Sequence, residues 1–336
     1  MVHTKRLIKS KYAAFLVTAA VFIAIFISSV LFGAADVTIQ DVRAAMFTSD
    51  SGEKLSMLRE IRFPRAFGAM AVGAALAVSG AIIQGLTRNP LADPGLLGIT
   101  AGANVALAIT IAFIPAANYF GMMIACFIGA AVGTLMVLGI GASRRGGFSP
   151  FRIVLAGAAV TAFLTAIAEG IGIYFKISKD VSMWTAGGLI GTSWGQLEIV
   201  TPFIFGGILI AVLLSKQLTI LSLSEEVAVG LGQHTTKVKI MLFIVIVILA
   251  GAAVALVGNM AFIGLMIPHI VRAVVGTDYR NVLPMSVLFG AGFMLLADLV
   301  GRTISAPYET PVAAIVAIIG LPFFLFIVRK EGKAFL

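Results

Sequence analysis

Charged residues are scarce in this chain. Only 12% of its 336 residues are Asp, Glu, Lys or Arg, while 60% are hydrophobic. Charged residues make up about a quarter of a soluble globular domain, so this class is excluded. One membrane-spanning helix needs about 20 apolar residues, which leaves room for about ten such helices and for no sizeable soluble domain. The composition therefore predicts an all-α polytopic membrane protein with one transmembrane domain over 1–336.

Cysteine and histidine are nearly absent. The single cysteine, Cys126, lies in an apolar run, which excludes a disulfide framework and a cysteine-based metal site. His3, His234 and His269 are too scattered for us to expect a metal site. The Gly-x4-Gly-Lys-Ser/Thr loop of nucleotide-binding proteins is missing, so the chain alone cannot bind and split a nucleotide. We expect no catalytic residue and no cofactor, and an energy source in an ion gradient or a partner.

Acidic residues are outnumbered, and the formal net charge is +9. In a soluble protein this excess suggests nucleic acid, but the cytoplasmic loops of membrane proteins also collect Lys and Arg. We therefore expect membrane lipid, and not nucleic acid, as a partner. With the N-terminus inside, the inner loops hold about twice as many Lys and Arg residues as the outer loops. This bias predicts a multi-pass protein of the cell membrane with both termini in the cytoplasm.

The apolar runs predict the membrane spans. They cover about 12–35, 65–86, 96–114, 119–142, 152–175, 197–215, 239–258, 261–276, 283–304 and 311–328. The first run follows a basic N-terminus, as in a signal peptide. It is longer than the apolar core of such a peptide and many spans follow, so we interpret it as a span. The run at 261–276 is short and contains Gly264 and Pro268, so the sequence defines its ends poorly.

Two segments rich in small residues indicate an internal repeat. The sequence GAALAVSG at 73–80 resembles GAAVALVG at 251–258. At the same offset Pro90 matches Pro268, and Gly98 matches Gly276. The order of the spans places the first copy on a helix that runs inward and the second on a helix that runs outward. This pattern predicts an inverted-topology repeat, which transporters use to build a path with two alternately open ends.

Two carboxylates fall inside predicted spans. Intramembrane carboxylates are typical of ion-coupled transporters, because burying a charge is costly. Asp298 lies four residues before Arg302, which also fits a self-neutralising pair on one helix face. Glu169 has no equally obvious partner. An ion-coupled secondary transporter is therefore one candidate class, and a channel is another.

One stretch is more distinctive than any composition argument. Residues 80–98 read GAIIQGLTRNPLADPGLLG, and the pattern alone predicts two helices joined by a turn at the inner face. With the RFPR string at 62–65 ahead of it, this stretch resembles the FecCD family. These proteins are the permease subunits of type II ABC importers for ferric siderophores, haem and cobalamin. The resemblance continues through LSLSEEVAVGLG at 221–232, GLMIPHIVR at 264–272, LADLVGR at 296–302 and GLPFF at 320–324.

The resemblance covers about residue 60 to the C-terminus and departs from the family pattern at one place. The family usually has glycine where this chain has Ala313, after Glu309-Thr-Pro-Val. The resemblance implies a cobalamin-permease-like bundle of about ten helices that translocates a ferric siderophore. Haem and cobalamin stay open as cargo. The implied partners are a second permease subunit, identical or homologous, two ATPase subunits and an extracytoplasmic substrate-binding protein.

The segment 218–236 is the longest inner loop. Ser224 is suited to cap a short helix, and Glu225 and Glu226 would lie in its first turn, where the helix dipole favours anions. Gly232 is suited to end that helix. A capped surface helix is all that the residues themselves require. The resemblance implies that this segment docks into the ATPase subunit through Glu225, Glu226, Ala228 and Gly232, with exposed small residues entering a groove.

At the outer face, Arg62 and Arg65 share one side of a helix start, and Arg302 lies near the outer end of its own span. Snorkelling to the interface explains each arginine alone. The resemblance implies that the set binds carboxylates of the substrate-binding protein, with Asp298 as a supporting residue that holds Arg302. It also implies that Asn89 narrows the cytoplasmic exit, although Asn is equally suited to cap a helix C-terminus.

Overall fold

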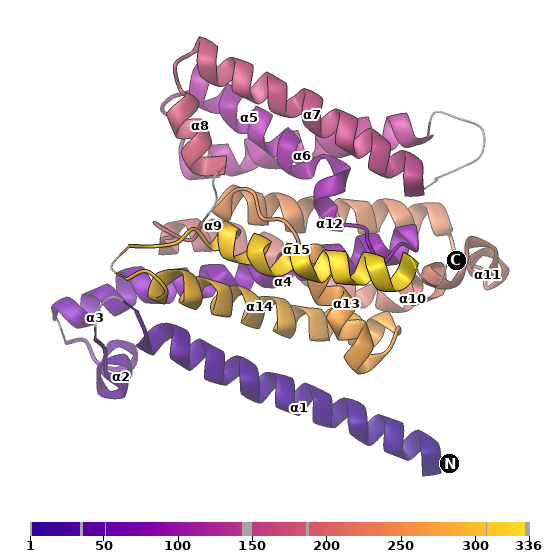
Figure 1. Cartoon of the computed structure of the whole chain (residues 1–336), viewed down its shortest axis with the longest axis horizontal. Coiled ribbons are helices and arrows are strands. Elements are labelled where there is room, and N and C mark those ends of the chain that lie inside the picture. Colours follow the sequence, from indigo (N-terminus) through magenta and orange to yellow (C-terminus); the bar gives the residue numbers. More distant parts are fainter. Residues whose placement is uncertain are drawn as a thin grey trace.

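The computed structural model describes residues 2–33, 36–50, 52–142, 150–185, 188–306 and 308–332. Within these ranges the regular structure is entirely helical (Figure 1). In chain order the elements are α1 (Val2–Leu31), α2 (Ile39–Phe47), α3 (Glu53–Met57), η1 (Leu58–Arg62), α4 (Phe63–Thr87), η2 (Pro94–Leu97), α5 (Ile99–Phe113), α6 (Tyr119–Ala142), α7 (Pro150–Tyr174), α8 (Ser178–Thr185), α9 (Trp194–Leu213), α10 (Ser215–Leu223), α11 (Glu225–Gly230), α12 (Thr235–Val257), α13 (Ile263–Val275), α14 (Tyr279–Thr303) and α15 (Val312–Gly332).

Each predicted span overlaps an α-helix of the structure, and most of the ends differ. In the described residues, 8 helices are long and apolar enough to cross a membrane. One of them is the continuous helix Glu53–Thr87, in which α3, η1 and α4 follow each other without a break. The helices α5 (Ile99–Phe113) and α13 (Ile263–Val275) are shorter, because a 3-10 turn precedes the first and an irregular segment precedes the second. The prediction of an all-helical bundle of about ten helices is confirmed.

Helix α4 lies at the centre of the bundle and contacts α14, α12, α13 and α9. Small residues bring these backbones unusually close. A Cβ atom added at Gly73 would lie 2.2 Å from the carbonyl oxygen of Gly290 in α14, and one at Gly80 would lie 1.9 Å from that of Gly264 in α13. No larger residue fits at either position. Close backbone approach of this kind replaces the hydrophobic driving force that helices lack in lipid.

Helices α4 and α12 run in opposite directions, as an inverted repeat requires (Figure 1). The residue alignment of the two copies does not extend to the helix boundaries. Gly80 lies inside α4, whereas Gly258 is the C-cap of α12. Likewise Pro268 lies inside α13, whereas Pro90 lies in the turn after α4. The antiparallel helices α4 and α12 are therefore present, but the two similar sequences lie at different positions along these helices.

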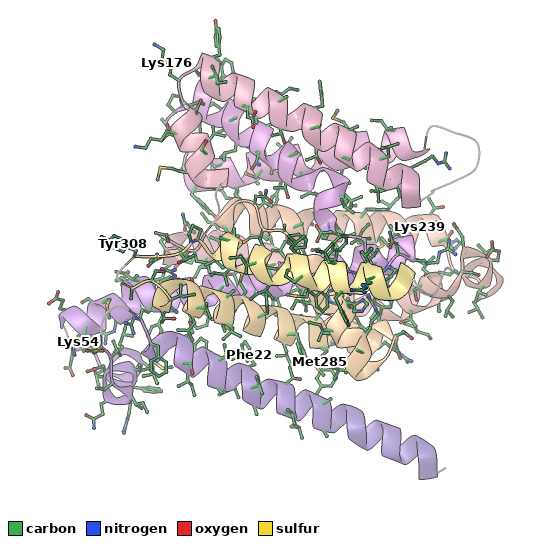
Figure 2. All side chains as sticks on the ribbon, viewed as in Figure 1. Phe22, Lys54, Lys176, Lys239, Met285 and Tyr308 are labelled. Atoms are coloured by element: carbon green, nitrogen blue, oxygen red, sulfur yellow. The ribbon has the colours of Figure 1, made fainter. Side chains whose placement is uncertain are left out.

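Two sets of helices cover this centre on opposite sides. Helix α1 lies along α14 at one edge, and α5, α6, α7 and α8 form the other edge (Figure 1). Phe22 of α1, labelled in Figure 2, lies against Gly292 of α14, which supports our interpretation of the first apolar run as a span. The start of α1 and the end of α15 lie at the same end of the bundle as α11 (Figure 1). The short helices α2, α3 and α8 lie at the opposite end.

Candidate functional site

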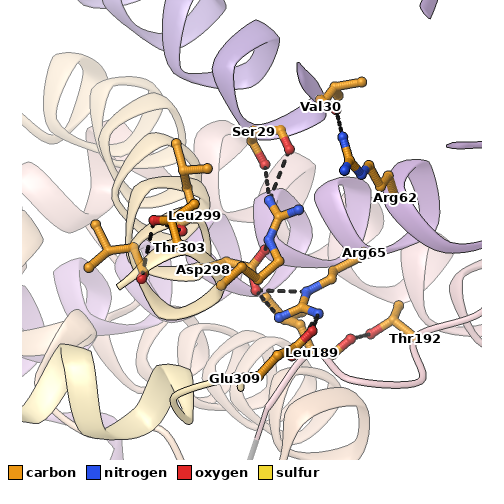
Figure 3. Close-up of polar contacts among 12 residues, drawn as sticks. Ser29, Val30, Arg62, Arg65, Leu189, Thr192, Asp298, Leu299, Thr303 and Glu309 are labelled. Atoms are coloured by element: carbon orange, nitrogen blue, oxygen red, sulfur yellow. Dashed lines mark hydrogen bonds and ion pairs between the residues drawn. The ribbon is translucent and has the colours of Figure 1, made fainter. Parts of the chain in front are cut away.

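A buried ion network joins α4, α14 and the segment before α15 (Figure 3). Arg65 Nη2 lies 2.8 Å from Asp298 Oδ1, and Arg65 Nε donates to the same oxygen at 2.9 Å. Arg65 Nη1 donates to both carboxylate oxygens of Glu309, at 2.8 and 2.9 Å. Arg302 Nε lies 3.0 Å from Asp298 Oδ2. Two arginines therefore balance two carboxylates, and the side chain of Asp298 is completely buried.

The same end of the bundle holds the last turn of α1. Arg302 Nη2 donates to the carbonyl oxygen and the hydroxyl of Ser29, at 2.9 and 3.0 Å. Arg62 Nη1 donates to the carbonyl oxygens of Val30 and Leu31, at 2.8 and 2.9 Å. Carbonyl groups in the last turn of a helix have no partner within the helix, so the two cations supply one. These contacts attach α1 to α4 and α14.

The structure thus brings the predicted residues Arg62, Arg65, Arg302 and Asp298 together, but not as an open docking surface. The three arginines are only 6–7% exposed, and groups of this chain occupy their guanidinium nitrogens. Neither interfacial snorkelling nor an exposed clamp describes this arrangement. Asp298 supports Arg65 as well as Arg302, and sequence reasoning had assigned no role to Glu309. A role in docking stays a prediction.

At the opposite end, α11 has the cap that the sequence predicts. The hydroxyl of Ser224 accepts a hydrogen bond from the backbone N–H of Val227 at 3.1 Å. Glu225 Oε1 lies 2.7 Å from Lys239 Nζ on α12, and this hydrogen bond lowers the pKa of Glu225 below its usual range. Hydrogen bonds from its own backbone N–H and from Ser224 lower the pKa of Glu226. Both carboxylates are therefore anionic at neutral pH.

The predicted exposure of Ala228 is wrong. Ala228 is completely buried. The backbone N–H of Gln233 donates to the carbonyl oxygen of Ala228 at 2.9 Å. Gly232 has a φ of 75° and lies just after the helix, where a left-handed conformation favours glycine. The exposed surface includes the small residues Gly230 and Gly232. It also includes large apolar residues that sequence reasoning missed, namely Leu223, Val227, Val229 and Leu231. A role of this surface in docking to the ATPase stays a prediction.

Helix α10 connects α11 to the central helices. Its Thr219 hydroxyl donates to Asp278 Oδ1 at 3.1 Å and accepts from the backbone N–H of Tyr279 at 3.0 Å, so it contacts the start of α14. A Cβ atom at Gly85, near the end of α4, would lie 2.8 Å from both Leu218 and Tyr279. Contacts through α10 therefore connect α11 with α14 and α4.

The turn after α4 differs in detail from the prediction. Arg88, with a φ of 52°, is the C-cap of α4, while the side-chain oxygen of Asn89 accepts from the backbone N–H of Leu91 at 2.9 Å. Asn89 therefore closes the turn and does not cap the helix. Gln84 Nε2, buried in α4, donates to the carbonyl oxygens of Gly264 and Leu265 in α13, at 3.1 and 3.2 Å. Gln84 was missed, although a lone amide in an apolar run was the signal.

The remaining polar candidates offer no metal site. Across the residues that the structure describes, no group of three or more His, Cys, Asp or Glu side chains is placed to hold a metal ion. The ring of His269 packs edge-on against Phe323 at 6.0 Å, as expected of a partly buried histidine. Glu169 lies on the exposed face of α7 and has no ion pair within the described ranges.

The 8 helices of the described residues that are long and apolar enough to cross a membrane define a multi-pass membrane protein. The chain belongs to the FecCD transport family, whose model matches residues 21–330. It is the permease component of an ABC importer, which works with a second permease and with a separate subunit that hydrolyses ATP. The chain itself is not an enzyme.

Named relatives cover most of the chain. The iron(3+)-hydroxamate import permease FhuB of Bacillus subtilis is 42% identical over 306 residues, covering 91% of this chain and 80% of the relative. The hemin transport permease HmuU of Yersinia pestis is 38% identical over 282 residues, covering 81% and 83%. A metal-chelate type ABC transporter solved in an inward-facing conformation has a TM-score of 0.82 at 25% identity, covering 95% of this chain and 99% of the other.

Proposed function

We propose that this permease carries a ferric siderophore that an extracytoplasmic binding protein delivers. Relatives named for ferric hydroxamate, ferric citrate and ferric enterobactin support iron chelates as the cargo class. The hydroxamate relative has the highest identity of the three. Haem is the alternative that a relative's name supports, and cobalamin is the other alternative that the resemblance implies.

The exposed apolar surface of α11 is the observation that carries the coupling part of this proposal. Leu223 and Leu231 are each 67% exposed, yet they flank a helix held by the Ser224 cap and by the Glu225–Lys239 pair. A rigid apolar surface outside the bundle suits a groove on the ATPase. Closure of the ATPase pair would displace α11, and α10 would pass this displacement to α14 and α4. The end that carries α11 and both termini then faces the cytoplasm.

The ion network would then face outward and receive the binding protein. Glu309 has a side chain that is 36% exposed and accepts from Arg65, which is itself buried. A carboxylate of the binding protein would replace Glu309 on Arg65, while Arg62 and Arg302 hold α1 in place. Removing the competing carboxylate in Glu309→Gln should therefore speed association, and Arg65→Glu should slow it. Equal association rates for both variants and the parent would refute docking at this site.

The experiment that tests the function is uptake of a ferric trihydroxamate by proteoliposomes. The vesicles contain this permease, the ATPase and the second permease subunit, and the binding protein is added outside. Uptake should require ATP, should stop with an inactive ATPase, and should persist with a proton uncoupler. Uptake that stops with the uncoupler while ATP is present would instead support ion coupling.

A further inference from the structure

The end of the bundle that carries α11 contains a cavity of about 720 Å³. It lies between the ends of α4, α6, α7 and α12, with α11 at one side; Figure 2 labels Lys239 at this place. The walls are Leu86, Thr87, Arg88, Leu138, Ile153, Glu225, Thr236, Lys239, Ile240 and Phe243.

The lining divides into an apolar and a charged part. Leu138, Ile153 and Phe243 lie within candidate membrane spans. Arg88 and Glu225 lie beyond the ends of α4 and α12. A cavity that is apolar along the spans and charged where the helices end matches a phospholipid, whose acyl chains and headgroup are divided in the same way. A free phosphate ion would leave the apolar part unfilled.

The residues that line the cavity include more cations than carboxylates. Lys239 has Glu225 as its partner, at 2.7 Å. Arg88 makes no ion pair within the described ranges, and it is held at the rim by a left-handed backbone conformation, which a residue other than glycine seldom adopts. The lining thus holds two cations and one carboxylate. Arg88 also acts electrostatically on Glu226, which lies outside the lining, so a phosphodiester would compete with Glu225 and Glu226 for the two cations. Basic pockets between spans on the cytoplasmic side are known to suit anionic lipid headgroups.

We propose that this cavity binds an anionic phospholipid, with its phosphate between Arg88 and Lys239 and its acyl chains along Leu138, Ile153 and Phe243. The phosphate competes with Glu225 for Lys239. Bound lipid therefore loosens the contact that attaches α11 to α12. This regulatory consequence rests on the proposed coupling role of α11, whereas lipid binding itself does not.

The binding experiment compares the intact transporter complex in nanodiscs of phosphatidylcholine with and without phosphatidylglycerol. Native mass spectrometry then counts the phosphatidylglycerol that the complex retains. Arg88→Asn, chosen because Asn tolerates the left-handed conformation, should weaken retention about tenfold through loss of a charge-assisted hydrogen bond. Glu225→Gln should strengthen retention severalfold by removing the competitor. Arg280→Gln is the matched control, since Arg280 is an exposed arginine at the start of α14, outside this cavity.

Three results would overturn the lipid site: Arg88→Asn retains the lipid as well as the parent does, Glu225→Gln weakens retention, or inorganic phosphate displaces the lipid at equal concentration. ATP hydrolysis by the same nanodiscs tests the consequence. It should depend on phosphatidylglycerol in the parent and lose that dependence in Arg88→Asn. ATP hydrolysis that does not change with phosphatidylglycerol would refute regulation alone. Uptake without ATP in the proteoliposomes described above would refute the proposed function.

Discussion

Arg65, at the start of α4, lies 2.8 Å from Asp298 near the end of α14, although 233 residues separate them. The contact joins α4 to α14, and both side chains are buried. Asp298 also pairs with Arg302, so its charge is shared between two cations. This arrangement places Asp298 at the centre of the ion network.

Replacing Asp298 by Asn should destabilise the permease strongly. The change leaves two buried guanidinium groups with one carboxylate, and breaking a buried ion pair costs about 3–5 kcal/mol. Thermal unfolding of the purified protein in detergent measures the effect. Arg280→Gln breaks an exposed pair, with Asp278, and should cost at most about 1 kcal/mol. Equal losses in the two variants would contradict the central role of Asp298.

The turn after α4 should make stability depend on pH. Burial raises the pKa of Asp93 from 3.8 to about 6. Between these two values the folded protein binds more protons at Asp93 than the unfolded chain does, so this group lowers stability as pH rises through the window. Asp93→Asn should remove that contribution and keep an oxygen for the N–H of Gly95. The difference in unfolding temperature between parent and variant should grow from pH 4 to pH 6 and then level off.

The apolar surface of α11 should be needed for binding of the ATPase but not for membrane insertion. Leu231→Asp places a charge on a surface that the ATPase would cover, so the ATPase should no longer copurify while membrane insertion stays normal. Phe47→Asp is the control, because Phe47 is 78% exposed on α2 at the opposite end. Retention of the ATPase by Leu231→Asp, or its loss in both variants, would remove α11 from the interface.

The intramembrane carboxylate Glu169 separates two classes of transporter. If ATP drives uptake, Glu169→Gln should keep the rate within about twofold and leave it insensitive to an uncoupler, because no proton transfer depends on this group. Uptake is measured with the same ferric trihydroxamate in proteoliposomes. Two results together would support the ion-coupled alternative: Glu169→Gln loses uptake, and the uncoupler inhibits uptake by the parent.

Local patterns were readable from the sequence, whereas long-range contacts were not. The Ser224 cap and the Asp298–Arg302 pair involve residues three or four positions apart, so spacing along a helix predicts them. Arg65 meets Glu309 across 244 residues, and no spacing rule connects them. The sequence also could not predict which residues of α11 are buried. A helix of 6 residues has too few positions for periodicity to show that Ala228 faces inward while Leu231 faces outward.

The energy source of uptake is the most direct test of this account. Proteoliposomes that contain the permease, the second permease subunit and the ATPase receive binding protein loaded with a radiolabelled ferric trihydroxamate. We expect iron to accumulate only when ATP is present on the side of the membrane that α11 faces. A proton uncoupler should not change the accumulation, and Leu231→Asp should abolish it. Accumulation driven by an imposed ion gradient in the absence of ATP would contradict this account.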